Sequence, residues 1–163
     1  MHILIYAIVE ATTEDDALAA GKATFDQLVG AAADASAVFD YYVTFDETAT
    51  TVAGEARWGE RPSAAPVDSE AGQELLEDGW EATKEEFERN LDRAKDALDD
   101  LDDEAIMRDE DLARHAFHNV GAYRGSSVFL YDEYGNGIRH RERLDQVCKR
   151  YEAPWIIPAD VHF

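Results

Sequence analysis

Residues 3–9 form the unbroken apolar run Ile-Leu-Ile-Tyr-Ala-Ile-Val. A strand with one face in water alternates apolar and polar residues, so a run without alternation is typical of a strand buried on both faces. Residues 127–131, Ser-Val-Phe-Leu-Tyr, are a second candidate of the same kind. The two runs favour a sheet that is covered by helices.

The segments around the first strand have equally clear patterns. Thr13, three residues before Asp16, is a helix-capping pattern, and the apolar spacing after it predicts a helix to about residue 33. Residues 37–45 alternate as a strand does, and the β-branched stretch 48–52 predicts the returning arm of a hairpin.

The middle of the chain is helical in pattern. Residues 54–69 contain two Gly and two Pro and predict a long loop, and a helical segment at about 70–120 follows it. Asp68 or Ser69 caps its first, long helix. One stripe of that helix carries apolar residues: Leu76, Trp80, Phe87, Leu91, Ala94, Leu98 and Leu101. Such a stripe indicates core packing or a helix-pairing seam rather than a cofactor surface.

The last third of the chain predicts a helix from about Asp109 to Gly121, a tight loop at 132–137 and a helix over 138–151. A final strand begins at 155, and we expect Pro158 to restrict it to an edge position or a strand end, because proline lacks a backbone donor.

The expected element order is therefore β-α-β-β-α-α-β-α-β. It predicts the α+β or α/β class, with a mixed, partly parallel sheet of about five strands covered by helices. A length of 163 residues suits a single domain over 1–163.

Several protein classes are excluded by the sequence. No run of about 18 apolar residues is present, so we expect no membrane span. The lone Cys148 cannot form an internal disulfide, which argues against an oxidised secreted scaffold. The N-terminus has no basic lead-in to an apolar segment, so the expected localisation is cytoplasmic.

The charge is strongly negative. Asp plus Glu number 36 against 15 Lys plus Arg, a net charge of −21, and the acids are spread along the whole chain. This pattern indicates salt adaptation, because at molar salt the Debye length is roughly 3 Å and self-repulsion is screened. A nucleic-acid mimic or a protein with a basic partner are the alternatives. Nonspecific nucleic-acid binding is disfavoured, since it needs a basic surface.

The stretch from Trp80 through Asp-Glu-Asp-Leu-Ala-Arg-His at 109–115 to the C-terminal Pro-Ala-Asp-Val-His-Phe at 158–163 resembles an uncharacterised family of small acidic haloarchaeal proteins. The resemblance covers nearly the whole chain and implies a salt-rich archaeal cytoplasm. No activity is known for that family, so the resemblance assigns no role to any residue.

A metal site is one hypothesis for function. Asp111, His115 and His118 share the polar face of the expected 109–121 helix, and His162 or Asp160 on the final strand could add a ligand. Carboxylate and imidazole groups are ligands for Zn²⁺ and similar divalent metals. The alternative is an exposed face on which Asp111 pairs with His115. Apart from such a metal, no cofactor is expected.

An anion or partner site is the second hypothesis. A Gly-rich turn after a buried strand, leading into a helix, exposes backbone N–H groups to an anion. The candidate residues are Asp132, Gly135, Gly137, Arg139, His140, Arg141 and Arg143. Basic side chains at a helix N-terminus oppose the helix dipole. They therefore need a counter-charge, which is either acids of this chain or of another subunit, or a bound anion.

A third candidate is the loop segment with Arg57, Trp58 and Arg61. An aromatic ring flanked by two guanidinium groups could clamp a planar or anionic ligand. The alternative is that Trp58 folds back over the core.

The sequence contains no Walker phosphate loop, nucleophile elbow, Cys-x-x-Cys or His-Glu-x-x-His motif. The leading function is therefore a binding or interaction module that forms homo-oligomers and takes a small anion or a protein partner. The alternative is a metal-dependent, hydrolase-like enzyme that uses the Asp/His cluster, and the sequence leaves open whether the protein is an enzyme.

Salt adaptation predicts that the protein loses stability when salt is removed. With a net charge of −21, dilution extends the range of repulsion several-fold, so the melting temperature should fall substantially between molar and dilute KCl. Thermal unfolding followed by circular dichroism measures the change. A melting temperature that stays constant over this range would contradict salt adaptation.

Overall fold

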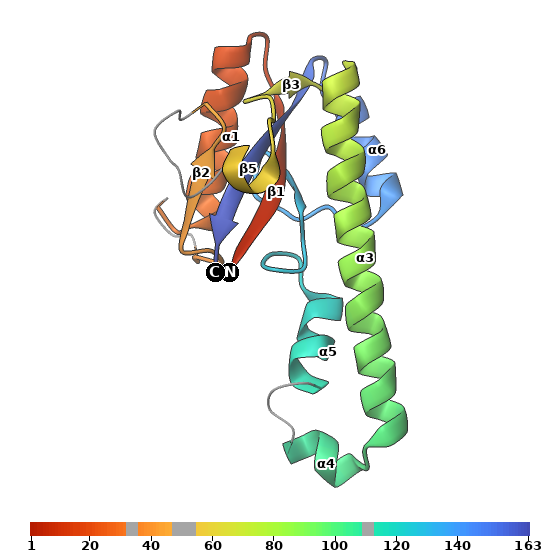
Figure 1. The fold of residues 1–163 in the computed structure, drawn as a ribbon. Coiled ribbons are helices and arrows are strands. Elements are labelled where there is room, and N and C mark those ends of the chain that lie inside the picture. The colour runs from red at the N-terminus through yellow and green to blue at the C-terminus, as the bar shows by residue number, and fades with distance from the viewer. Residues whose placement is uncertain (32–35, 47–54, 109–112) are drawn as a thin grey trace.

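The computed structural model describes residues 1–31, 36–46, 55–108 and 113–163. These residues form a sheet with helices on both faces, together with a helical arm that extends beyond the sheet (Figure 1). The strands are β1 (His2–Glu10), β2 (Tyr41–Thr44), β3 (Ala65–Pro66), β4 (Leu130–Asp132) and β5 (Pro154–His162). The helices are α1 (Glu14–Leu28), α2 (Glu55–Trp58), α3 (Glu70–Asp100), α4 (Asp103–Arg108), α5 (Ala113–Gly121) and α6 (Arg141–Arg150).

The first and last strands lie at the centre of the sheet. The strand order is β2-β5-β1-β4, and β3 pairs with β5 beside β2. Strand β1 is parallel to β4 and antiparallel to β5, with which it pairs from His2↔His162 to Glu10↔Pro154. The mixed, partly parallel sheet predicted from the sequence is thus confirmed.

Strand β1 is buried on both faces, as its unbroken apolar run predicts. Ile5 and Val9 contribute to a core cluster with residues of α1. Tyr6 and Ile8 contribute to a second cluster with residues of α3 and α6. Figure 1 shows α1 on one side of the sheet and α3 with α6 on the other.

The expectation for Pro158 was wrong, because β5 is an interior strand and Pro158 lies in its middle. The backbone N–H of Tyr6 donates to Phe129 O, toward β4. Tyr6 is paired with Pro158, so the Pro158 nitrogen points away from β1. On that side of β5, the pairing with β3 includes Ile156, and the pairing with β2 begins at Ala159. The proline therefore faces the gap between two short strands, where no donor is needed.

Several other boundaries differ from the prediction: β2 is shorter than the strand expected at 37–45, β4 begins later than the run at 127–131, and α6 is shorter than the helix expected over 138–151. Helix α1 ends at Leu28, before residue 33, because Gly30 adopts a φ of +71° and the Ala31 N–H donates back to Asp26 O at 2.8 Å. The long loop expected at 54–69 contains the short elements α2 and β3. The strand expected at 48–52 lies outside the described residues.

Helix α3 forms one side of the arm. Ser69 caps its start, where Oγ accepts from the N–H of Gly72 at 3.1 Å. The C-terminal half leaves the sheet and runs beside α5, and α4 lies at the free end (Figure 1). The predicted apolar stripe is therefore only partly buried: Leu76 and Ala94 are buried, whereas Phe87 and Leu98 are exposed. No helix of the described ranges is both long and apolar enough to cross a membrane.

Gly79 lets α3 approach the sheet closely. A Cβ atom at this position would lie 2.7 Å from Cδ2 of Tyr6 and 2.8 Å from Cδ2 of Leu130. Both distances are shorter than van der Waals contact, so a larger residue would require the side chains of Tyr6 and Leu130, or the helix itself, to shift.

We expect Gly79→Ala to lower the free energy of unfolding by about 1–3 kcal/mol through overpacking. The matched control is Gly121→Ala at the end of α5, where an added Cβ meets no atom within 4 Å. Denaturant unfolding of both variants in the same salt measures the difference. Equal stabilities of the two variants would show that the helix is not packed as described.

Candidate functional site

The carboxylate of Asp132, at the end of β4, organises the loop that follows. The side chain is buried, and Oδ1 accepts hydrogen bonds from the backbone N–H groups of Tyr134 and Asn136, both at 3.0 Å. The Asp132 N–H in turn donates to Asn136 O at 2.9 Å. A carboxylate that accepts backbone donors in this way holds a tight turn in one conformation.

The backbone conformation of this loop requires glycine at two positions. Gly135 has a φ of +68°, in the left-handed region. Gly137 donates its N–H to Tyr123 O at 3.1 Å, and a Cβ atom at 137 would lie 2.0 Å from that oxygen. The loop can therefore lie against Tyr123 only because residue 137 has no side chain.

His140 caps the start of α6. Its Nδ1 accepts from the N–H of Arg143 at 3.2 Å. Because Nδ1 acts as the acceptor, the proton of the neutral ring lies on Nε2. His140 is exposed, so this N–H is a donor that solvent or a ligand can reach.

Arg141 and Arg143 both pair with acids of other elements in the same chain. Arg141 donates to both carboxylate oxygens of Glu77 on α3, at 2.8 and 3.1 Å. These hydrogen bonds hold the pKa of Glu77 below its ordinary value. Arg143 donates to Oδ2 of Asp132 at 3.2 Å. From the sequence, the counter-charge of these arginines could be either acidic side chains or a bound anion. In the structure, acidic side chains supply it for Arg141 and Arg143.

Arg139 is the basic residue with the most unusual surroundings. Its Nη2 donates to Val120 O, in the last turn of α5, at 2.6 Å. Its guanidinium lies over the rings of Phe87 and Tyr123, 5.5 and 5.9 Å from their centroids. Burial lowers the pKa of Arg139 from its ordinary value. Within the described part of the chain, no carboxylate forms an ion pair with it.

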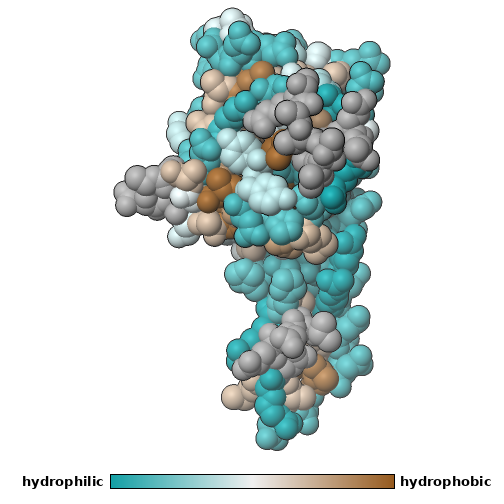
Figure 2. All heavy atoms as spheres, turned by 60° about the vertical axis from the view of Figure 1, so that its left-hand side comes forward, coloured by the Kyte–Doolittle hydropathy of each residue, from teal (hydrophilic) through white to brown (hydrophobic). Residues whose placement is uncertain are grey.

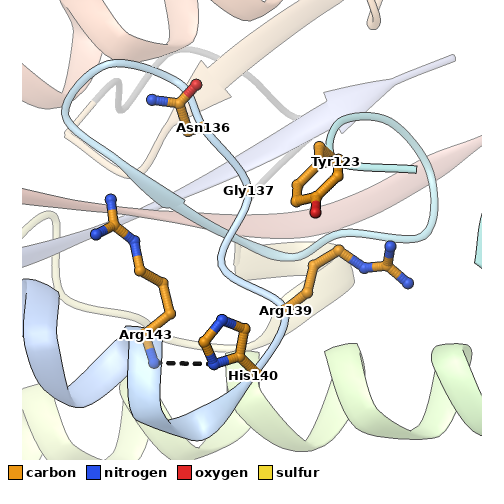
Figure 3. Close-up of a pocket in the computed structure, with 6 residues that line it drawn as sticks. All are labelled: Tyr123, Asn136, Gly137, Arg139, His140 and Arg143. Carbon is orange, nitrogen blue, oxygen red and sulfur yellow. Dashed lines mark hydrogen bonds between the residues drawn. The ribbon is translucent and has the colours of Figure 1, made fainter. Parts of the chain in front are cut away.

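These side chains surround a cavity of about 410 Å³. It is lined by Tyr123, Asn136, Gly137, Arg139, His140 and Arg143. Figure 3 shows His140 between the two arginines, with Arg143 extending on the side of Asn136 and Arg139 on the side of Tyr123. Three lining residues are basic and none is acidic, in a chain of net charge −21. Such a lining can donate several hydrogen bonds to one anion.

The structure brings together four of the seven residues predicted for this site. Gly137, Arg139, His140 and Arg143 line the cavity, whereas Asp132 and Gly135 shape the loop and Arg141 faces α3. Sequence reasoning missed Tyr123 and Asn136. Asn136 lies within the predicted loop and could have been included, but Tyr123 is brought in only by the tertiary contact with Gly137.

The described residues of the metal hypothesis are divided between α5 and β5. His115 and His118 are exposed on α5, and Nε2 of His115 is 2.9 Å from Nδ2 of Asn119. His162 lies at the end of β5, with Nδ1 at 2.9 Å from Asp40. Asp111 is outside the described residues. Among those that are described, no group of three or more His, Cys, Asp or Glu side chains is placed to hold a metal ion.

Trp58 packs partly buried against the core cluster that includes Leu4 and Leu76. Arg61 pairs with Asp78 of α3 at 2.6 Å, and Arg57 is exposed. The structure therefore shows the alternative in which Trp58 folds back over the core, and α3 supplies the counter-charge of Arg61.

Comparisons of the chain with curated proteins and with solved structures found no match. A family model described as "Domain of unknown function (DUF7995)" matches residues 1–163, and the chain therefore belongs to this family.

Proposed function

We propose that the protein is a salt-adapted binding module that holds a small anion, a phosphorylated or carboxylated metabolite, in the cavity beside Tyr123. One observation carries the proposal: Arg139, His140 and Arg143 line one cavity without any acidic lining residue. Arg143 is paired with Asp132, so Arg139 is the lining cation for which no carboxylate partner is described, and a bound anion would supply its counter-charge.

Arg139 contributes most to the expected affinity. Its guanidinium is half-buried and already stacked on two aromatic rings, so little side-chain entropy is lost when it binds a ligand. Arg143 is paired with Asp132, while His140 adds an N–H donor at the start of α6. A helix N-terminus also favours negative charge.

Salt adaptation determines which contacts contribute to the affinity for the anion. At molar salt, charges separated by more than roughly 3 Å are screened, so only direct hydrogen bonds to the anion retain their strength. Arginine forms such bonds in pairs with phosphate and carboxylate oxygens. The proposal thus combines an acidic surface, suited to a salt-rich cytoplasm, with a short-range basic site.

Inorganic phosphate should raise the melting temperature of the protein at constant ionic strength. At a phosphate concentration of about ten times Kd, binding stabilises the folded state by about 1.4 kcal/mol. This raises the melting temperature by roughly 3–6 °C for a chain of this size. We expect Arg139→Gln to remove most of this increment. His140→Asn should reduce it while keeping the helix cap, because asparagine is a good N-cap residue.

The matched control is Arg93→Gln, which removes an exposed arginine on α3 outside the cavity. Each increment is measured against the same variant in chloride of equal ionic strength, which cancels differences in basal stability. The same increment in Arg139→Gln and Arg93→Gln would contradict binding in this cavity.

The proposal includes self-association of two copies through the arm. Three large apolar side chains of the arm are left exposed: Leu98 by 60%, Met107 by 76% and Phe117 by 37%. Figure 2 shows a hydrophilic arm surface that hydrophobic atoms interrupt near the free end. Because acidic residues surround them, two arms should approach only when salt screens their charges.

Replacing Leu98 and Met107 together with Gln should weaken self-association by about tenfold or more, since each buried apolar side chain contributes on the order of 1.5 kcal/mol. Sedimentation velocity in molar KCl measures the dissociation constant. Tyr134→Gln, which changes an exposed aromatic outside the arm, is the control. A wild-type chain that is monomeric at all concentrations in molar KCl would refute this part of the proposal.

A further inference from the structure

A second cluster of polar side chains lies across β1, β5 and β2, away from the anion cavity. The strand register places His2, His162 and Tyr41 directly opposite one another on these three strands. The next step along the sheet pairs Leu4, Asp160 and Val43 in the same way. Side chains at these positions point to the same face of the sheet, because residues two apart on a strand share a face.

Asp160 and His2 form a buried carboxylate–imidazole pair. The Asp160 side chain is fully buried, and both of its oxygens lie 3.1 Å from Nδ1 of His2. A buried carboxylate requires such a partner, because removing it from water is otherwise costly. With Nδ1 directed at Asp160, His2 presents Nε2 toward the hydroxyl of Tyr41, in the position of a base.

Tyr41 completes a relay from carboxylate to imidazole to hydroxyl. Its Oη lies 3.5 Å from Nε2 of His2, and Tyr41 is 42% exposed on strand β2. Contacts of this kind are often long in unliganded structures and shorten when a substrate binds. The order Asp160–His2–Tyr41 is the arrangement that activates a hydroxyl nucleophile: a carboxylate orients the base, and the base faces the hydroxyl.

The ring of His162 holds the phenol in place. It stacks on Tyr41 with centroids 5.3 Å apart and planes at 9°, and its Nδ1 is held by Asp40 at 2.9 Å. His162 is therefore a positioning residue, because its contact is with the ring of Tyr41 and not with the hydroxyl.

We propose that Tyr41 is a nucleophile for acyl transfer from activated carboxylic esters, with His2 as its base and Asp160 orienting His2. Tyr41 Oη attacks the ester carbonyl carbon and its proton passes to Nε2 of His2. The carbon–oxygen bond to the leaving group breaks, and the leaving group departs with the electron pair and takes up a proton. Water then attacks the acyl-tyrosine, which releases the acid and restores Tyr41. The net reaction is ester plus water to acid plus alcohol.

This proposal is independent of the anion cavity, since the two sites share no residue. It distinguishes Tyr41 from Tyr134, which is more exposed, at 57%, and whose phenol lies beside Glu133 and Arg150 and not beside an imidazole. Exposure alone predicts faster acylation of Tyr134, whereas activation by His2 predicts faster acylation of Tyr41.

The test is acetylation by p-nitrophenyl acetate, followed by peptide mass spectrometry at each tyrosine and by release of p-nitrophenolate. In the folded wild type, we expect Tyr41 to be acetylated at least about tenfold faster than Tyr134. His2→Gln should remove that advantage, and Tyr41→Phe should lower p-nitrophenolate release to the rate at which the amines and the other imidazoles of the chain react. Tyr134→Phe, the matched control, should leave the acetylation of Tyr41 and the release of p-nitrophenolate unchanged.

Equal acetylation of Tyr41 and Tyr134 in the wild type would overturn the proposal without any variant, so the test does not depend on the folding of His2→Gln. Unchanged p-nitrophenolate release in Tyr41→Phe would also overturn it, because groups other than Tyr41 would then account for the reaction.

Discussion

The antiparallel pairing of β1 with β5 is the interaction on which the rest of the structure depends. It joins the first and last strands of the chain over nine residue pairs, from His2↔His162 to Glu10↔Pro154. Because this pair lies at the centre of the sheet, every other strand is added to it, and α1 on one face and α3 with α6 on the other cover it. Closing the chain from end to end costs entropy that only extensive burial offsets.

The same pairing determines what lies in each candidate site. Strand β4 pairs with β1 and is buried. Asp132 is its last residue, and its carboxylate fixes the loop beside Tyr123. On the other side, the register with β5 brings His2 opposite His162 and directs Asp160 to the same face. A slip of one residue would move the Asp160 carboxylate to the α1 face, away from His2.

Features encoded by neighbouring residues could be predicted from the sequence. The caps at Thr13 and Ser69 and the turn held by Asp132 depend on contacts within a few residues, and the strand at 3–9 is marked by its own apolar run. Features that depend on distant pairing could not. The interior position of Pro158 requires knowledge of the strand order, and the pair His2–Asp160 joins residues 158 positions apart. The exposure of Leu98 likewise depends on where α3 leaves the sheet.

Native-state hydrogen exchange in molar KCl tests most directly whether the structure depends on the β1–β5 pair. Amides near Ile5 and Ile157, both buried at the centre of the sheet, should exchange only by global unfolding, with an opening free energy equal to that from denaturant unfolding. Amides of α5 on the arm should exchange at a lower free energy. If α5 amides are as protected as those of β1 and β5, or if the central amides open below the global value, the dependence described here is contradicted.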